Sequence, residues 1–119
     1  MVGLGRIAAA AATLSIVLAA SAEAQTPRRE SLAQDLSSCA GAVAAEADIN
    51  VLTYAPGGSH ELSPLLDAIL ARLNVEPGVE GMTGRYAAAD ARRFWADQSA
   101  RRRQAAVTRC RTRFGGGTP

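Results

Sequence analysis

The chain contains no lysine, and all thirteen of its basic residues are arginines. We interpret this as a compositional bias, since a requirement for a guanidinium group at every basic position is not credible. Cysteine and aromatic residues are also scarce, with two cysteines and five aromatic side chains among 119 residues. A chain with so few large side chains has a thin core, and small domains of this kind often need a covalent staple.

The motifs of most enzyme classes are missing as well. There is no C-x-x-C, no G-x-S-x-G and no phosphate-loop glycine pattern. His60 is the single histidine and has no second His or Cys at metal-ligand spacing, so we interpret it as a helix-start residue near a cap. Glu46 and Asp48 lie two positions apart on a predicted helix and face different directions. The sequence therefore predicts no enzyme, no metal and no cofactor.

The N-terminus has the order of a secretory signal. Arg6 precedes the apolar run Ile7–Ala20, and small residues follow at Ala22 and Ala24. We predict a cleaved signal peptide of residues 1–24, with a periplasmic or secreted product. An uncleaved anchor is the alternative, although the run is shorter than the ~20 residues that cross a bilayer. The mature chain does not begin with cysteine, so a lipoprotein is not expected.

Export would place both cysteines in an oxidising compartment. A Cys39–Cys110 disulfide is then the first expectation, and two free thiols or an intermolecular bridge are the alternatives. Closing so long a loop stabilises a fold by roughly 4 kcal/mol in the chain-entropy model.

Three helical segments are predicted within one domain of residues 25–114, followed by a disordered tail of residues 115–119. The first covers Arg29–Asn50, where Leu32, Leu36, Cys39 and Val43 recur at spacings of four and three residues. The third covers residues 85–114 and has a continuous seam at the same spacing. The seam comprises Tyr86, Ala89, Arg93, Ala96, Ala100, Arg103, Val107, Cys110 and Phe114.

The second helix covers Ser63–Val75, where Ser63 is a candidate cap and Pro64 suits the first helical position. Its aliphatic side chains form the most apolar face of the protein, named here the leucine-rich face. This face is expected to form the main core, and any exposed part of it is a candidate surface for a partner or an unfolded client. It comprises Leu62, Leu65, Leu66, Ile69, Leu70 and Leu73.

A Cys39–Cys110 bond also predicts topology. At a rise of ~1.5 Å per residue, the two cysteines match in height only if the first and third helices run antiparallel. Facing residues then have numbers that sum to about 149, which places Glu46 opposite Arg103 and predicts a structural ion pair. The expected fold is all-α, with the first and third helices antiparallel and the short leucine-rich helix packed across them.

Arginines surround the third helix instead of forming a stripe. Residues 85–119 contain nine arginines and two acidic residues, whereas residues 25–84 contain three arginines and eight acidic residues. Much of the positive charge is therefore expected to be neutralised by acidic side chains within the domain. The rival expectation is an anion-binding surface, made by Arg101, Arg102, Arg103, Arg109, Arg111 and Arg113.

The sequence thus predicts an exported, non-enzymatic protein that binds another envelope protein, as small interaction, chaperone or inhibitor proteins do. The alternative is an arginine-mediated binder of anionic envelope surfaces, either lipid headgroups or lipopolysaccharide. Nucleic acid is not an expected ligand, because an exported chain rarely meets it and the arginines do not track one face. The two expectations differ in their response to salt, which weakens only the binding of exposed charges.

Overall fold

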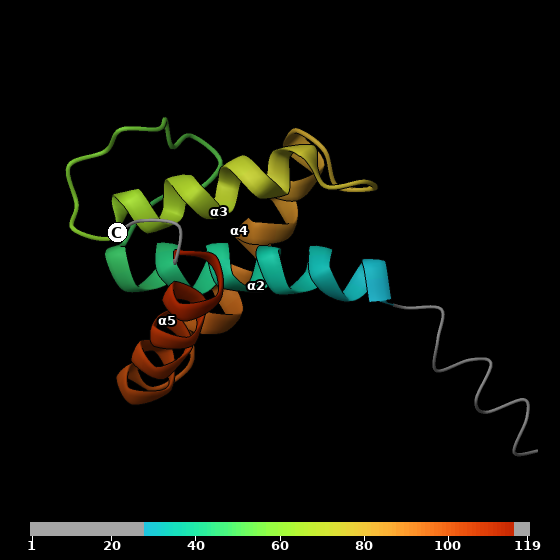
Figure 1. The fold of residues 1–119 in the computed structure, drawn as a ribbon. Coiled ribbons are helices and arrows are strands. Elements are labelled where there is room, and N and C mark those ends of the chain that lie inside the picture. The colour runs from blue at the N-terminus through green and yellow to red at the C-terminus, as the bar shows by residue number, and fades with distance from the viewer. Residues whose placement is uncertain (1–27, 116–119) are drawn as a thin grey trace, which may run out of the picture. The chain divides into compact units, whose positions relative to one another are not determined.

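The computed structural model describes residues 28–115, which form helices joined by loops and contain no strand. The predicted signal peptide and residues 116–119 of the predicted tail lie outside the described residues. The chain divides into two units, Met1–Ser31 and Leu32–Pro119, and the packing described below is that of the second. The helices are α2 (Arg28–Ala47), α3 (Ser63–Val75), α4 (Met82–Ala96) and α5 (Ala100–Phe114) (Figure 1).

Helix α2 is buried on every side in its C-terminal half. The five consecutive residues 40–44 are all buried, and five residues cover more than one full turn of 3.6 residues. Four of the five are alanine or glycine, so neighbouring helices approach the backbone closely. A Cβ added at Gly41 would lie 2.5 Å from the Cβ of Ala91 on α4, which makes this glycine a requirement of the α2–α4 contact.

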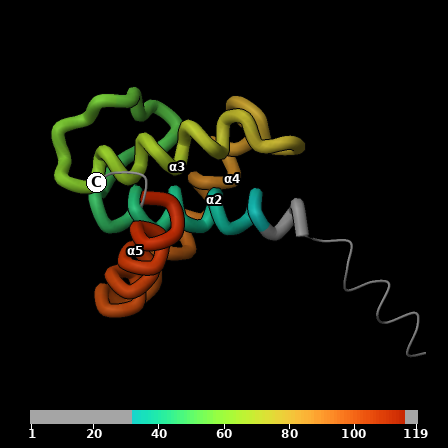
Figure 2. Tube along the Cα trace, viewed as in Figure 1, coloured from blue at the N-terminus to red at the C-terminus, as the bar shows by residue number. Residues whose placement is uncertain are grey.

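Helix α3 supplies most of the bulk of the core. It runs alongside α2 (Figure 1 and Figure 2), and its aliphatic side chains join Leu36 and Val43 of α2 in one cluster. Pro64 occupies the first turn of α3, as predicted, but Ser63 makes no capping bond. The His60 carbonyl and imidazole instead accept from the N–H groups of Ser63 and Leu62, which places His60 at the helix start.

The predicted long third helix is wrong, because the structure contains two helices, α4 and α5, in its place. Asp97 and Gln98 end α4, and Ser99 adopts an extended conformation and caps α5 by accepting from the Arg102 N–H. Arg103 closes the other side of the break, since its Nη1 donates to the carbonyls of Trp95 and Gln98. The Trp95 carbonyl also accepts from the Gln98 N–H, so the guanidinium adds a second donor at the end of α4 and one at the Gln98 carbonyl in the break.

The predicted seam is consequently correct along α5 from Arg103 onward and wrong at Ala100 and along most of α4. Val107, Cys110 and Phe114 are buried, whereas Tyr86 and Arg93 are exposed. A break of three residues changes the helix direction, so a spacing that continues across it no longer selects one face.

The Cys39–Cys110 disulfide is present, with the two Cα atoms 5.6 Å apart, and it indicates an oxidising, non-cytoplasmic compartment. Two ion pairs flank it, Asp35–Arg113 and Glu46–Arg103. The three contacts pair rising residue numbers on α2 (35, 39 and 46) with falling residue numbers on α5 (113, 110 and 103). The two helices therefore run in the predicted antiparallel order.

Although the two helices are antiparallel, α5 crosses α2 at a steep angle (Figure 1). The two flanking ion pairs are therefore made by long side chains. The packing therefore differs from the expected pair of aligned helices with a third across them. Helix α2 is enclosed instead by the other three helices of the unit.

Side-chain contacts fix the loop between α2 and α3. Asp67 of α3 accepts from the Tyr54 hydroxyl at 2.5 Å and from the Gly57 N–H at 2.9 Å. Arg85 of α4 donates to the carbonyls of Val51 and Tyr54. The polar groups of an otherwise irregular segment are thereby paired to two helices.

Candidate binding surfaces on α4 and α5

The leucine-rich face is not available as a docking surface. All six of its side chains are between 0 and 7% exposed, because α3 turns this face toward α2, α4 and α5. The hypothesis that part of it is exposed to a partner is therefore wrong. Its role is the main core, with Leu62, Leu65, Leu66, Ile69, Leu70 and Leu73 all buried.

A different apolar feature is exposed on α4 and was missed by the sequence analysis. Met82, Tyr86 and Phe94 are 50, 60 and 57% exposed, and the exposed Asp90 lies between the last two. These four residues recur at intervals of four, so they form one ridge that slants gradually around the helix; we name them the α4 row. The regular spacing was the available signal, but the continuous seam through Tyr86 obscured it.

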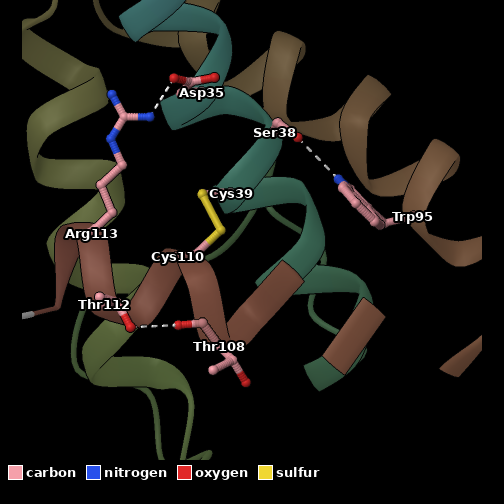
Figure 3. The surroundings of a disulfide bond; sticks show 8 residues. All are labelled: Asp35, Ser38, Cys39, Trp95, Thr108, Cys110, Thr112 and Arg113. Carbon is pink, nitrogen blue, oxygen red and sulfur yellow. Dashed lines mark hydrogen bonds and ion pairs between the residues drawn. A yellow bond between two sulfur atoms is a disulfide. The ribbon is translucent and has the colours of Figure 1, made fainter. Parts of the chain in front are cut away.

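Two of the six candidate anion-binding arginines are engaged within the domain. Arg103 Nε lies 3.0 Å from Glu46 Oε1, with both side chains mostly buried, so the predicted ion pair is present. Arg113 pairs with Asp35 (Figure 3), and its guanidinium lies 5.0 Å from the centre of the Phe114 ring. These two guanidinium groups hold α5 against α2, which removes them from the set offered to a ligand.

The other four, Arg101, Arg102, Arg109 and Arg111, are exposed. None of them forms an ion pair with a carboxylate in the part of the chain that the structure describes. Arg102 makes one side-chain contact there, a 3.2 Å hydrogen bond to the neutral amide oxygen of Gln98. Carboxylates of the described residues therefore neutralise only part of the positive charge of α5.

A hollow of about 240 Å³ lies between α4 and α5, and we name it the arginine hollow. Phe94 and Trp95 line it from α4, and their rings meet edge to face with centroids 5.1 Å apart. Arg102 and Arg109 line it from α5. The remaining lining residues are Gln98 and Ala105, so no carboxylate faces this space.

A second hollow of about 260 Å³ shares Trp95 and Arg109 with the first and lies beside the disulfide. Trp95 Nε1 donates to Ser38 Oγ on α2 at 3.2 Å (Figure 3), which orients the indole between the two hollows. The acid in this second space is Asp35, which already binds Arg113. The acid of the second hollow is thus already paired with an arginine, and Arg102 does not line this space.

Another hollow, beside His60, is lined by Glu46 and Glu61 as well, but Glu46 and His60 already have partners within the domain. Glu46 binds Arg103, and His60 Nδ1 accepts from the Leu62 N–H. Thr108, the hydroxyl of this hollow, donates to the Gln104 carbonyl of its own helix. Within residues 28–115, no three potential His, Cys, Asp or Glu ligands come together as a metal site.

No protein-family model matches the sequence, and neither the curated proteins nor the solved structures include a match. Among the described helices, none combines the length and the apolar character needed to span a bilayer.

Proposed function

We propose that this chain is an exported, non-enzymatic binding protein that docks another envelope protein through the α4 row. The observation that carries the proposal is the exposure of Met82, Tyr86 and Phe94 along one ridge of a helix. Aromatic and methionine side chains are enriched at protein interfaces, and a helix with anchors spaced along one ridge is suited to a complementary groove. Asp90 adds a negative charge within the row, which favours a partner groove with a basic side chain.

Export rests on the signal-peptide pattern of residues 1–24 together with the disulfide, and the periplasm or the outside of the cell is the proposed location. The partner is proposed to be a protein because Asp90, within the row, would repel an anionic membrane.

The test is site-specific photo-crosslinking in the exporting cell. A photoreactive residue at Tyr86 should capture a defined partner, and one at the exposed Thr112 on α5 should not. Binding of that partner to the purified protein should then weaken about 30-fold or more for Tyr86→Ala, the loss of an interface hot spot of about 2 kcal/mol.

The matched control is Val75→Ala, which removes an exposed apolar side chain that lies outside the row. Its affinity should equal that of the wild type. Equal losses in the two variants, or equal capture from Thr112, would contradict docking through the α4 row.

A second candidate function is the binding of anionic envelope surfaces, either lipid headgroups or lipopolysaccharide. It is supported by Arg101, Arg102, Arg109 and Arg111, which are exposed and have no carboxylate partner among the described residues. Cosedimentation with anionic vesicles should be strong at low salt and should vanish near 1 M salt, where the Debye length falls to ~3 Å. Docking through the α4 row should persist at that salt.

A further inference from the structure

We propose that the arginine hollow binds the phosphate headgroup of an anionic phospholipid, with Arg102 and Arg109 on the phosphate and Phe94 and Trp95 against the adjoining glycerol and acyl carbons. This inference rests on the second candidate function and narrows it to one site. The hollow shares Phe94 with the α4 row, whereas Tyr86, which tests docking through that row, does not line the hollow.

The charge of the hollow selects an anion. Its two guanidinium groups have no carboxylate among the lining residues, and Arg102 contacts only the neutral Gln98 amide. Arginine suits phosphate because its planar group donates two parallel hydrogen bonds and loses less hydration than an ammonium group does. An anion that enters this space therefore gains two strong donors without displacing an existing ion pair.

The apolar wall distinguishes a lipid from a free anion. Phe94 is 57% exposed beside two charged groups, a costly arrangement for a site that receives only inorganic phosphate. In a phospholipid, esterified carbons follow directly after the phosphate, and aromatic side chains prefer the same boundary between headgroups and acyl chains. Trp95 is held in position for this contact by its hydrogen bond to Ser38.

The size of the hollow and its surroundings argue against other occupants. At about 240 Å³ it is smaller than the ~300–1,000 Å³ of sites that enclose a whole small molecule, so most of the ligand must remain outside. An acidic peptide would need further unoccupied arginines along the same side of α5. The next one, Arg113, is already bound to Asp35. One anionic group on a larger apolar body fits these features.

The experiment uses the protein purified after export by its expression host, with the N-terminus identified by mass spectrometry. The protein is titrated with vesicles of phosphatidylglycerol and phosphatidylcholine and, in a separate titration, with vesicles of phosphatidylcholine alone. Trp95 is the single tryptophan of the chain, so its emission reports occupancy of the hollow. We expect a blue shift with the anionic vesicles and quenching by phospholipids that are brominated in the acyl chain.

Two double variants with the same net charge decide the site. Arg102→Gln/Arg109→Gln removes the donors of the hollow, and Arg101→Gln/Arg111→Gln removes two exposed arginines that do not line it. The first pair should lower vesicle affinity at least about tenfold more than the second, since an arginine outside the hollow contributes only general attraction. Phe94→Ala should weaken vesicle binding while leaving any emission change caused by inorganic phosphate intact.

Each contrary result has a distinct meaning. Equal losses in the two double variants, with circular dichroism and the disulfide unchanged, overturn the site and leave only a general anionic surface. Absence of wild-type binding at every salt concentration overturns the second candidate function together with the site. An emission change that inorganic phosphate or polyglutamate reproduces in full, without vesicle binding, assigns the hollow to another anion and overturns the lipid assignment.

Discussion

Helices α3 and α4 each carry a set of large apolar side chains, but the two sets differ in their exposure to solvent. The six side chains of the leucine-rich face on α3 are buried, whereas Met82, Tyr86 and Phe94 on α4 are at least half exposed. The side of α4 that packs inward is made of small residues, with Gly84 and Ala88 buried and Ala91 in contact range of Gly41. A small-residue face permits close approach of two backbones, and the bulky residues are then left on the outside.

The comparison teaches that apolar density alone does not identify a binding surface. In a protein with few large side chains, a wide aliphatic face gains the most from removal from water, so this face is buried when the domain folds. The sparser α4 row is interrupted by Asp90 and is left exposed. The two faces should therefore respond differently to mutation, and the following experiments test that difference.

The largest effect is expected from removing the disulfide, which ties α5 to α2. The double variant Cys39→Ala/Cys110→Ala should lose roughly 4 kcal/mol of unfolding free energy, measured by urea denaturation. Helices α4 and α5 should loosen before α3, because burial on the leucine-rich face does not depend on the bond. Hydrogen exchange that accelerates equally in all four helices would contradict the distinction.

Truncation within the two faces compares them directly. Leu66→Ala should lower the unfolding free energy by about 3 kcal/mol, since Leu66 is fully buried and its removal leaves a cavity. Tyr86→Ala should change it by about 0.5 kcal/mol or less. Thermal and urea unfolding measure both variants, and a Tyr86 variant as unstable as the Leu66 variant would mean that the α4 row is structural.

The close approach of α2 and α4 is tested at Gly41. Gly41→Ala should lower stability by about 2 kcal/mol, because the new Cβ would lie 2.5 Å from the Ala91 Cβ and 2.6 Å from the Arg92 nitrogen. Adding Ala91→Gly should restore part of the loss by removing one of these atoms. If Gly41→Ala unfolds at the wild-type urea concentration, the two backbones are not in contact as described.

Among the changes that remove a structural contact, the smallest effect concerns the break between α4 and α5. Ser99→Ala should lower the unfolding free energy by about 1 kcal/mol, because the N–H of Arg102 loses its capping acceptor. Ser99→Asp should retain wild-type stability, since aspartate caps as well as serine does. Equal stability of all three proteins in urea would show that the cap does not determine where α5 begins.

Much of the frame could be predicted from local pattern and covalent chemistry. The all-α class, the Cys39–Cys110 bond and the Glu46–Arg103 pair all follow from helical spacing combined with one cross-link. The break at residues 97–99 was missed because it contains neither glycine nor proline. Its signal was the serine cap, worth only about 1 kcal/mol, which is weaker than a seam repeated over thirty residues.

The candidate site could be predicted only in part. Six arginines were correctly placed on the C-terminal helix, but which of them are paired depends on residues far away in the chain, such as Asp35 for Arg113. The arginine hollow depends on α4 turning back beside α5, so that Phe94 and Trp95 meet Arg102 and Arg109. On one continuous helix, Trp95 and Arg109 would share a face but would lie about 21 Å apart, so the spacing alone does not bring these four residues to one space.

By itself, the sequence determined the all-α class, the disulfide and the antiparallel order of α2 and α5, because each follows from 3.6-residue periodicity and the reach of a covalent bond. Only the tertiary structure decided which apolar face is buried and which arginines pair with carboxylates. The core is too small to bury every apolar face of the helices, so which face is buried depends on how all the helices pack together. The periodicity within one helix does not contain that information.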